Sequence, residues 1–224
     1  MSVQSSLRNA LLSGAAVVLA STAEAQFSVR TVDAPGATDI TDINVAETLL
    51  LSEPTLGSGL YSSINFVGSS GDADFPGGVS FPGIVNPSDQ FAMEALAKII
   101  FNVTGSYVFR VNSDDGFRLR SGVNANGTGG TTYSEFVTPR GPGNTDGPAI
   151  AVPAGATTNA RLTFFEQTGG DEIELSYSLN GGAFNLVGST SDITVLPLQP
   201  IPEPGSIALL GIGLAGLLAR RQRR

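Results

Sequence analysis

The sequence predicts an all-β fold, an antiparallel β-sandwich flanked by an N-terminal signal helix and a C-terminal transmembrane helix. Many short segments alternate apolar and polar residues, turn residues separate them, and helical periodicity is scarce between the termini. These patterns divide the chain into a signal peptide at residues 1–25, a β-sandwich domain at 26–200 and a sorting and anchor segment at 201–224.

The first 25 residues are typical of a secretion signal. Arg8 supplies a positive charge, residues 10–20 form an apolar stretch, and Ala23-Glu24-Ala25 is an A-x-A cleavage site. Cleavage between Ala25 and Gln26 would leave Gln26 as the first residue of the exported protein. A buried N-terminal helix is the alternative.

Composition excludes several classes of function. Residues 26–200 carry seven basic and 18 acidic side chains, a net charge of −11, which repels nucleic acid. The chain has no Cys, His or Trp, so disulfides, zinc sites with thiolate or imidazole ligands, and Ser-His-Asp relays are impossible. Carboxylate chemistry and oxygen-ligated cations such as calcium remain.

Alternation identifies the strands. Apolar residues recur at every second position over 91–103, which predicts a strand, although 91–98 also contains good helix formers and could be a short helix. The clearest strand is 172–179, which Asn180-Gly181 follows as a hairpin turn. One or two strands are expected within 26–59 and a long loop over 67–88. Further strands are expected at 106–111, 117–120, 132–138, 149–152, 161–167, 183–187 and 192–196.

The C-terminus reads as a short membrane anchor. Prolines punctuate residues 197–204, and an uncharged apolar run of 15 residues follows at 205–219. Such a helix spans about 22 Å, less than a hydrocarbon core of about 30 Å. Four Arg within residues 220–224 would stay cytoplasmic. A buried core helix is the alternative.

This terminus resembles the PEP-CTERM sorting signal. Pro202-Glu203-Pro204 precedes a Gly-, Ala- and Leu-rich helix and a terminal Arg run, three features in a fixed order. The resemblance implies processing by an exosortase, removal of the helix, and a Gram-negative producer whose exported proteins often accompany exopolysaccharide. The protein would then be an inner-membrane-anchored precursor that reaches the cell surface or the extracellular space.

Residues 106–119 resemble the central hairpin of the domain family named after the anthrax protective antigen. The likeness is strongest at Ser113-Asp114-Asp115-Gly116, extends to Gly59-Leu60-Tyr61 and to residues 161–177, and spans about 58–188. It implies a β-sandwich. In the lectin members of that family, two paired Asp residues joined by a cis peptide bind calcium, which holds the vicinal hydroxyls of a sugar.

The paired carboxylates Asp114 and Asp115 are therefore the candidate calcium ligands. Consecutive side chains on a regular strand point to opposite faces, so a shared ion requires a special backbone. An ordinary Asp-Gly turn, which needs no metal, is the alternative. The resemblance also implies an Asn ligand from another loop, for which Asn124, Asn126 and Asn144 are candidates.

Other acidic residues form weaker patterns. Asp72 and Asp74 make a D-x-D motif that suits either calcium or a solvated loop. A general acid and base for glycoside cleavage could come from four further carboxylates, but alternation places two of them, Glu172 and Glu174, on a polar strand face that would serve solubility. The four are Glu166, Asp171, Glu172 and Glu174.

Three functions follow from these patterns. The first is an exported surface or matrix protein that binds carbohydrate, for example extracellular polysaccharide, through calcium. The second is a passive structural component of the envelope or matrix. The third is a carboxylate-dependent glycoside hydrolase, which ranks last, so we expect a protein that is not an enzyme.

Overall fold

The computed structural model describes residues 26–36, 38–68, 71, 73–85 and 89–198. The predicted signal peptide, the whole of the predicted sorting segment at 201–224 and Asp72 lie outside these residues. Within the described ranges, no helix combines the length and apolar character needed to cross a bilayer.

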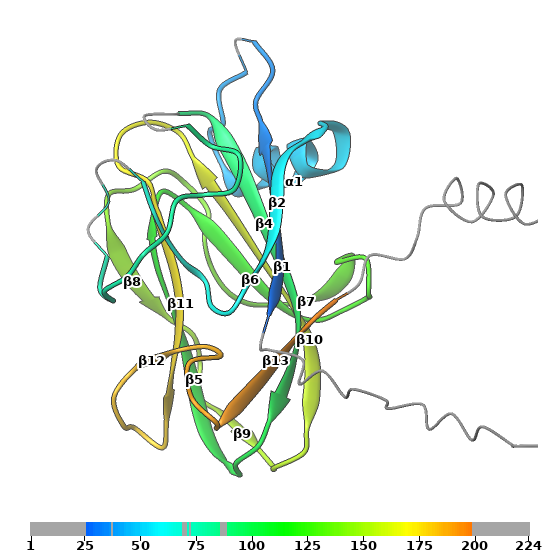
Figure 1. Cartoon of the computed structure of the whole chain (residues 1–224), viewed down its shortest axis with the longest axis vertical. Coiled ribbons are helices and arrows are strands. Elements are labelled where there is room, and N and C mark those ends of the chain that lie inside the picture. Colours follow the sequence, from blue (N-terminus) through cyan, green and yellow to red (C-terminus); the bar gives the residue numbers. More distant parts are fainter. Residues whose placement is uncertain (1–25, 37, 69–70, 72, 86–88, 199–224) are drawn as a thin grey trace, which may run out of the picture.

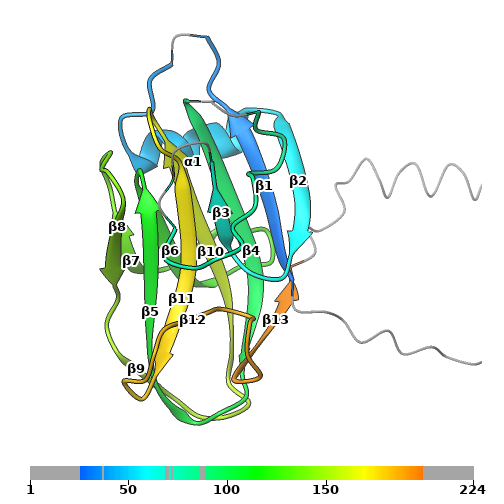
Figure 2. The same ribbon diagram turned by 60° about the vertical axis from the view of Figure 1, so that its left-hand side comes forward.

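Two antiparallel sheets pack face to face (Figures 1 and 2), which confirms the predicted β-sandwich. The first sheet has the order β2-β1-β4-β10-β6-β7, with β13 also paired to β4. Its strands are β1 Phe27–Asp33, β2 Thr55–Tyr61, β4 Phe91–Phe101, β6 Phe117–Val123, β7 Gly129–Phe136, β10 Thr157–Glu166 and β13 Ile193–Pro197. The second sheet has the order β12-β11-β5-β8, with β3 paired to β11 and β9 to β5. Its strands are β3 Asn65–Val67, β5 Gly105–Asp114, β8 Gly143–Asp146, β9 Ile150–Val152, β11 Glu172–Leu179 and β12 Asn185–Leu186.

Two short strands share one edge of the long strand β4. β1 pairs with its first half, from Phe91 to Leu96, and β13 pairs with its second half, from Ala97 to Phe101. The backbone N–H of Gln26 donates to the carbonyl of Val195 at 3.1 Å. The first and last strands of the described chain therefore meet end to end.

The predicted alternation of core-facing and outward-facing residues in β4 is confirmed. Its odd-numbered residues from Phe91 to Phe101 face the core between the sheets, so the alternative of a short helix over 91–98 is wrong. Phe81, from the long connection between β3 and β4, also enters this core. Its ring lies 5.4 Å from the rings of both Phe66 and Phe164. The connection is therefore anchored to both sheets.

The main correction to the predicted fold is the helix α1, Ile43–Ser52, where only strands were expected. The Asp42 carboxylate caps its N-terminus by accepting hydrogen bonds from the N–H groups of Asn44 and Val45, at 2.7 and 3.3 Å. The helix covers the outer face of the first sheet with four apolar residues at helical spacing. These buried residues are Ile43, Ala46, Leu49 and Leu50.

Candidate functional site

The paired Asp residues lie at the junction of β5 and β6. Asp114 ends β5, opposite Glu172 of β11, and the peptide bond between Asp114 and Asp115 is cis, as the family resemblance implies. Gly116 follows in a confined position, because a Cβ atom there would lie 2.7 Å from the carbonyl oxygen of Phe136. Only glycine fits this approach of two backbones.

Backbone donors hold the Asp115 carboxylate in place. Its Oδ1 accepts from the N–H of Arg140 at 2.9 Å, and its Oδ2 accepts from the N–H of Gln167 at 2.7 Å. Asp115 is 4% exposed and Asp114 is 6% exposed. These two N–H groups come from separate segments of the chain, so the position of Asp115 depends on the tertiary fold.

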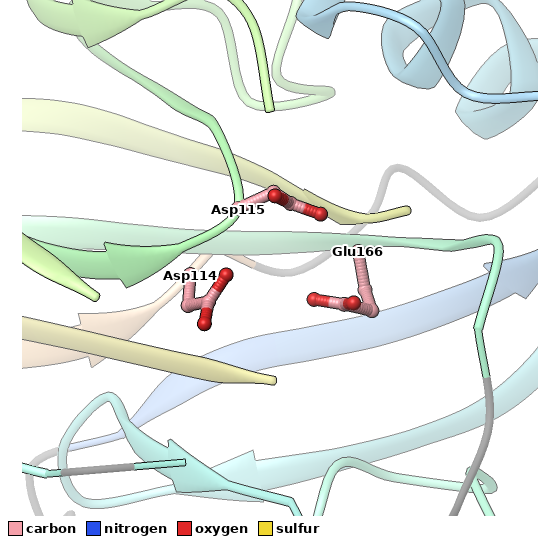
Figure 3. A group of neighbouring side chains, drawn as sticks. All are labelled: Asp114, Asp115 and Glu166. Atoms are coloured by element: carbon pink, nitrogen blue, oxygen red, sulfur yellow. The ribbon is translucent and has the colours of Figure 1, made fainter. Parts of the chain in front are cut away.

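Glu166, the last residue of β10, completes a cluster with this pair. Carboxylate oxygens of Asp114, Asp115 and Glu166 all lie within 4.8 Å of one another. Figure 3 shows the Glu166 carboxylate directed toward that of Asp114, with Asp115 beside them. Glu166 is fully buried, and neither of its oxygens has a hydrogen-bond partner in the described structure. Sequence reasoning considered Glu166 only for hydrolysis and missed this convergence.

Burial and mutual repulsion raise the pKa of these groups. Burial, followed by the charge of Asp115, raises the pKa of Asp114 to about 6. Burial, followed by the charges of Asp115 and Asp114, raises the pKa of Glu166 to about 10. Burial also raises the pKa of Asp115, although the Gln167 and Arg140 backbone N–H groups oppose this effect. The cluster therefore resists carrying three negative charges without a cation.

One cationic side chain lies near the cluster. The Arg140 guanidinium donates to the hydroxyls of Ser113 and Thr145, both at 2.9 Å, and stacks 4.4 Å from the Phe136 ring centroid. Its charge lowers the pKa of Asp114, against the larger effect of burial. Arg140 thus offsets part of the negative charge, although within the described residues its guanidinium forms no ion pair with the three carboxylates.

The donor set fits a hard cation. Calcium takes oxygen ligands at about 2.3–2.6 Å, so two ligands of one ion lie at most about 5 Å apart. The three carboxylates meet this limit, since their ligand atoms lie within 4.8 Å. A cation would also supply the partner that the buried Glu166 oxygens lack. Asp114, Asp115 and Glu166 are the residues that could hold it.

The three Asn residues that were candidate calcium ligands lie in two separate parts of the structure. Asn124 and Asn126 lie in the turn after β6 and bond to Thr128. The seven residues of β6, about 20 Å at strand rise, separate this turn from Asp115. Asn144 lies on β8 opposite Asn112, and its amide donates to Asp74 at 2.9 Å. Asp74 therefore bonds to Asn144, while its partner in the D-x-D motif, Asp72, lies outside the described residues.

The interpretation of Glu172 and Glu174 as solubilising surface residues is wrong. Both face away from the core, as alternation predicts, but they are 0% and 1% exposed. The loop after β3 covers this face of the sheet, and the Glu174 carboxylate accepts from the N–H groups of Asp74 and Phe75, both at 2.9 Å. Asp171 is also buried, at 2% exposure. Alternation identifies the face of a strand but not what covers that face.

Residues 200–224 match the model of the PEP-CTERM protein-sorting motif, as predicted. A solved PA14 sugar-binding domain from an RTX adhesin has a TM-score of 0.56 to this chain at 14% identity, covering 73% of this chain and 95% of its own. The PA14 domain of the MpAFP antifreeze protein has a TM-score of 0.58 at 11% identity, covering 90% and 100%.

The chain carries a PEP-CTERM sorting motif, and its β-sandwich has the PA14 fold. The A domain of epithelial adhesin 6 from Candida glabrata, solved with Galb1-3GlcNAc, is also similar, with a TM-score of 0.57 and 17% identity over 78% of this chain and 88% of its own. No curated protein matches the sequence. The PEP-CTERM motif indicates an exported, membrane-associated precursor.

Proposed function

We propose that this chain is a cell-surface or extracellular-matrix protein whose PA14-type sandwich binds carbohydrate through calcium held by Asp114 and Asp115. The observation that carries the proposal is the convergence of buried carboxylates within 4.8 Å, at the position where the two consecutive Asp residues are joined by a cis peptide. Calcium provides the positive charge that compensates these carboxylates, and its remaining coordination positions accept sugar hydroxyls.

The comparisons support the choice of ligand and location. Two of the similar structures are a sugar-binding domain from an RTX adhesin and an epithelial adhesin domain in complex with Galb1-3GlcNAc. The PEP-CTERM motif supports delivery through an exosortase-type enzyme to the cell surface, where extracellular polysaccharide is the natural partner. In the precursor, the apolar run at residues 205–219 would provide the contact with the membrane.

Calorimetry with calcium and a glycan array test the proposal. The wild-type chain should release heat with calcium and retain glycans only when calcium is present. The double substitution Asp114→Asn with Asp115→Asn should abolish both signals. Asp33→Asn, which removes an exposed carboxylate at the end of β1, is the matched control and should bind normally. A wild type without a calcium signal or glycan binding contradicts the proposal.

A passive structural role is the second candidate, and the burial of the cluster favours it. The three carboxylates are at most 6% exposed, as expected of an ion that only stabilises the fold. This candidate predicts a calcium signal with an empty glycan array and an unchanged surface phenotype in the double variant. A glycoside hydrolase would instead turn over polysaccharide and lose this activity in Glu166→Gln.

A further inference from the structure

Two other buried glutamates of the described structure, Glu94 and Glu174, have hydrogen-bond partners for both of their carboxylate oxygens. Both oxygens of Glu94 accept from arginines, Arg30 at 2.8 Å and Arg161 at 2.6 Å. Both oxygens of Glu174 accept from backbone N–H groups at 2.9 Å. Glu166 is equally buried, yet neither oxygen has a partner among the described residues. A buried carboxyl group without a partner costs free energy in either protonation state.

The backbone on both sides of Glu166 is hydrogen-bonded to Asp115 and to the next residue, Gly116. Before it, the N–H of Phe165 donates to the carbonyl of Gly116 at 3.1 Å. After it, the N–H of Gln167 donates to the Asp115 carboxylate at 2.7 Å. Glu166 is therefore aimed at the pair by bonds that do not involve its own side chain, as expected of a residue held ready for a ligand.

Among the described residues, no cationic side chain forms an ion pair with Glu166. The Arg140 guanidinium is engaged by Ser113, Gly143 and Thr145. The charged groups that act most strongly on Glu166 are all carboxylates, those of Asp115, Asp114, Asp171 and Asp89. Within the described residues, Glu166 therefore lacks a source of compensating positive charge.

We propose that Glu166 is a third direct ligand of the cation, so that three carboxylates hold it. This inference rests on the proposed function, because it concerns the same ion. Three negative charges exceed the charge of calcium, so a trivalent ion of similar size should bind more tightly than calcium. Magnesium, which demands a near-ideal octahedron at about 2.0–2.1 Å and keeps several waters, should bind weakly.

Terbium provides the test because its luminescence lifetimes in H₂O and D₂O count the waters on the bound ion. The full chain, stripped of cations, is titrated with Tb³⁺ and with Ca²⁺. We expect Glu166→Gln to lower Tb³⁺ affinity at least about tenfold and to reduce the ratio of Tb³⁺ to Ca²⁺ affinity. Glu166→Ala should add at least one water to the bound ion.

Two controls make the result decisive. Glu174→Gln removes the same charge from a buried glutamate outside the cluster and should leave the water count unchanged. Asp115→Asn should abolish binding. If the wild type binds calcium, Asp115→Asn does not, and both Glu166 variants match the wild type in affinity and water count, the third ligand is refuted while the proposed function stands. If the wild type binds neither ion, the proposed function itself fails. Thermal unfolding in EDTA verifies that each variant folds.

Discussion

The stability of the cation-free protein should fall as the pH rises. The pKa of Glu166 is about 10 in the folded chain, because of burial first and neighbouring carboxylates second, against 4.5 for an ordinary glutamate side chain. Between pH 6 and 8 the folded state therefore holds one proton that the unfolded state has released. This contribution to stability is fully present below pH 4.5 and disappears as the pH rises through about 10.

One excess proton corresponds to a slope of about −1.4 kcal/mol per pH unit in the free energy of unfolding. The loss between pH 6 and 8 is then about 3 kcal/mol. The pKa of Asp114, about 6 against 3.8, adds a similar slope, but mainly below pH 6. Saturating calcium should flatten the slope, because a bound carboxylate carries no proton in the folded state. The apparent calcium affinity should accordingly rise with pH.

Urea unfolding at pH 6, 7 and 8, in EDTA and in calcium, measures both slopes. Glu166→Gln should remove most of the slope in EDTA, since the amide does not titrate and only the end of the Asp114 titration remains above pH 6. Glu174→Gln, the matched control outside the cluster, should retain it. A wild-type stability in EDTA that is independent of pH over this range would refute the conclusion that Glu166 is a protonated, buried carboxyl group.

Three further predictions concern the fold, and urea unfolding measures each. Asp42→Ala should cost about 1 kcal/mol, because it removes the cap of α1, whereas Asp42→Asn should cost little. Gly57→Ala should cost roughly 1–3 kcal/mol, because its Cβ would lie 2.4 Å from the carbonyl carbon of Pro82; Gly141→Ala, with no atom within 4 Å, should be silent. Phe164→Ala should cost about 3–5 kcal/mol, since this fully buried ring joins the central aromatic cluster. A loss of stability below about 0.5 kcal/mol in Asp42→Ala would contradict the helix cap. The same small loss in Gly57→Ala would contradict the close approach to Pro82, and in Phe164→Ala it would contradict the aromatic packing.

Alternation was a good guide to the strands that lie between the two sheets. β11 has the predicted bounds, Glu172–Leu179, and β4 begins at the predicted residue, because one face of each strand packs against the core. Asn180 and Gly181 both have positive φ, as a tight hairpin turn requires. Alternation missed α1, although Asp42 is a capping residue and apolar residues follow it at helical spacing. It also missed β8, a four-residue edge strand without apolar periodicity.

The sequence by itself determined the β-sandwich, the sorting motif at the C-terminus and the pair Asp114 and Asp115, because each depends on residues that are close together in the chain. Only the tertiary structure decided that Glu166 of β10 joins this pair, and that the loop after β3 buries Glu172 and Glu174. Strand periodicity states which way a side chain points. Which distant strand or loop lies opposite depends on sheet pairing, a property of the whole fold.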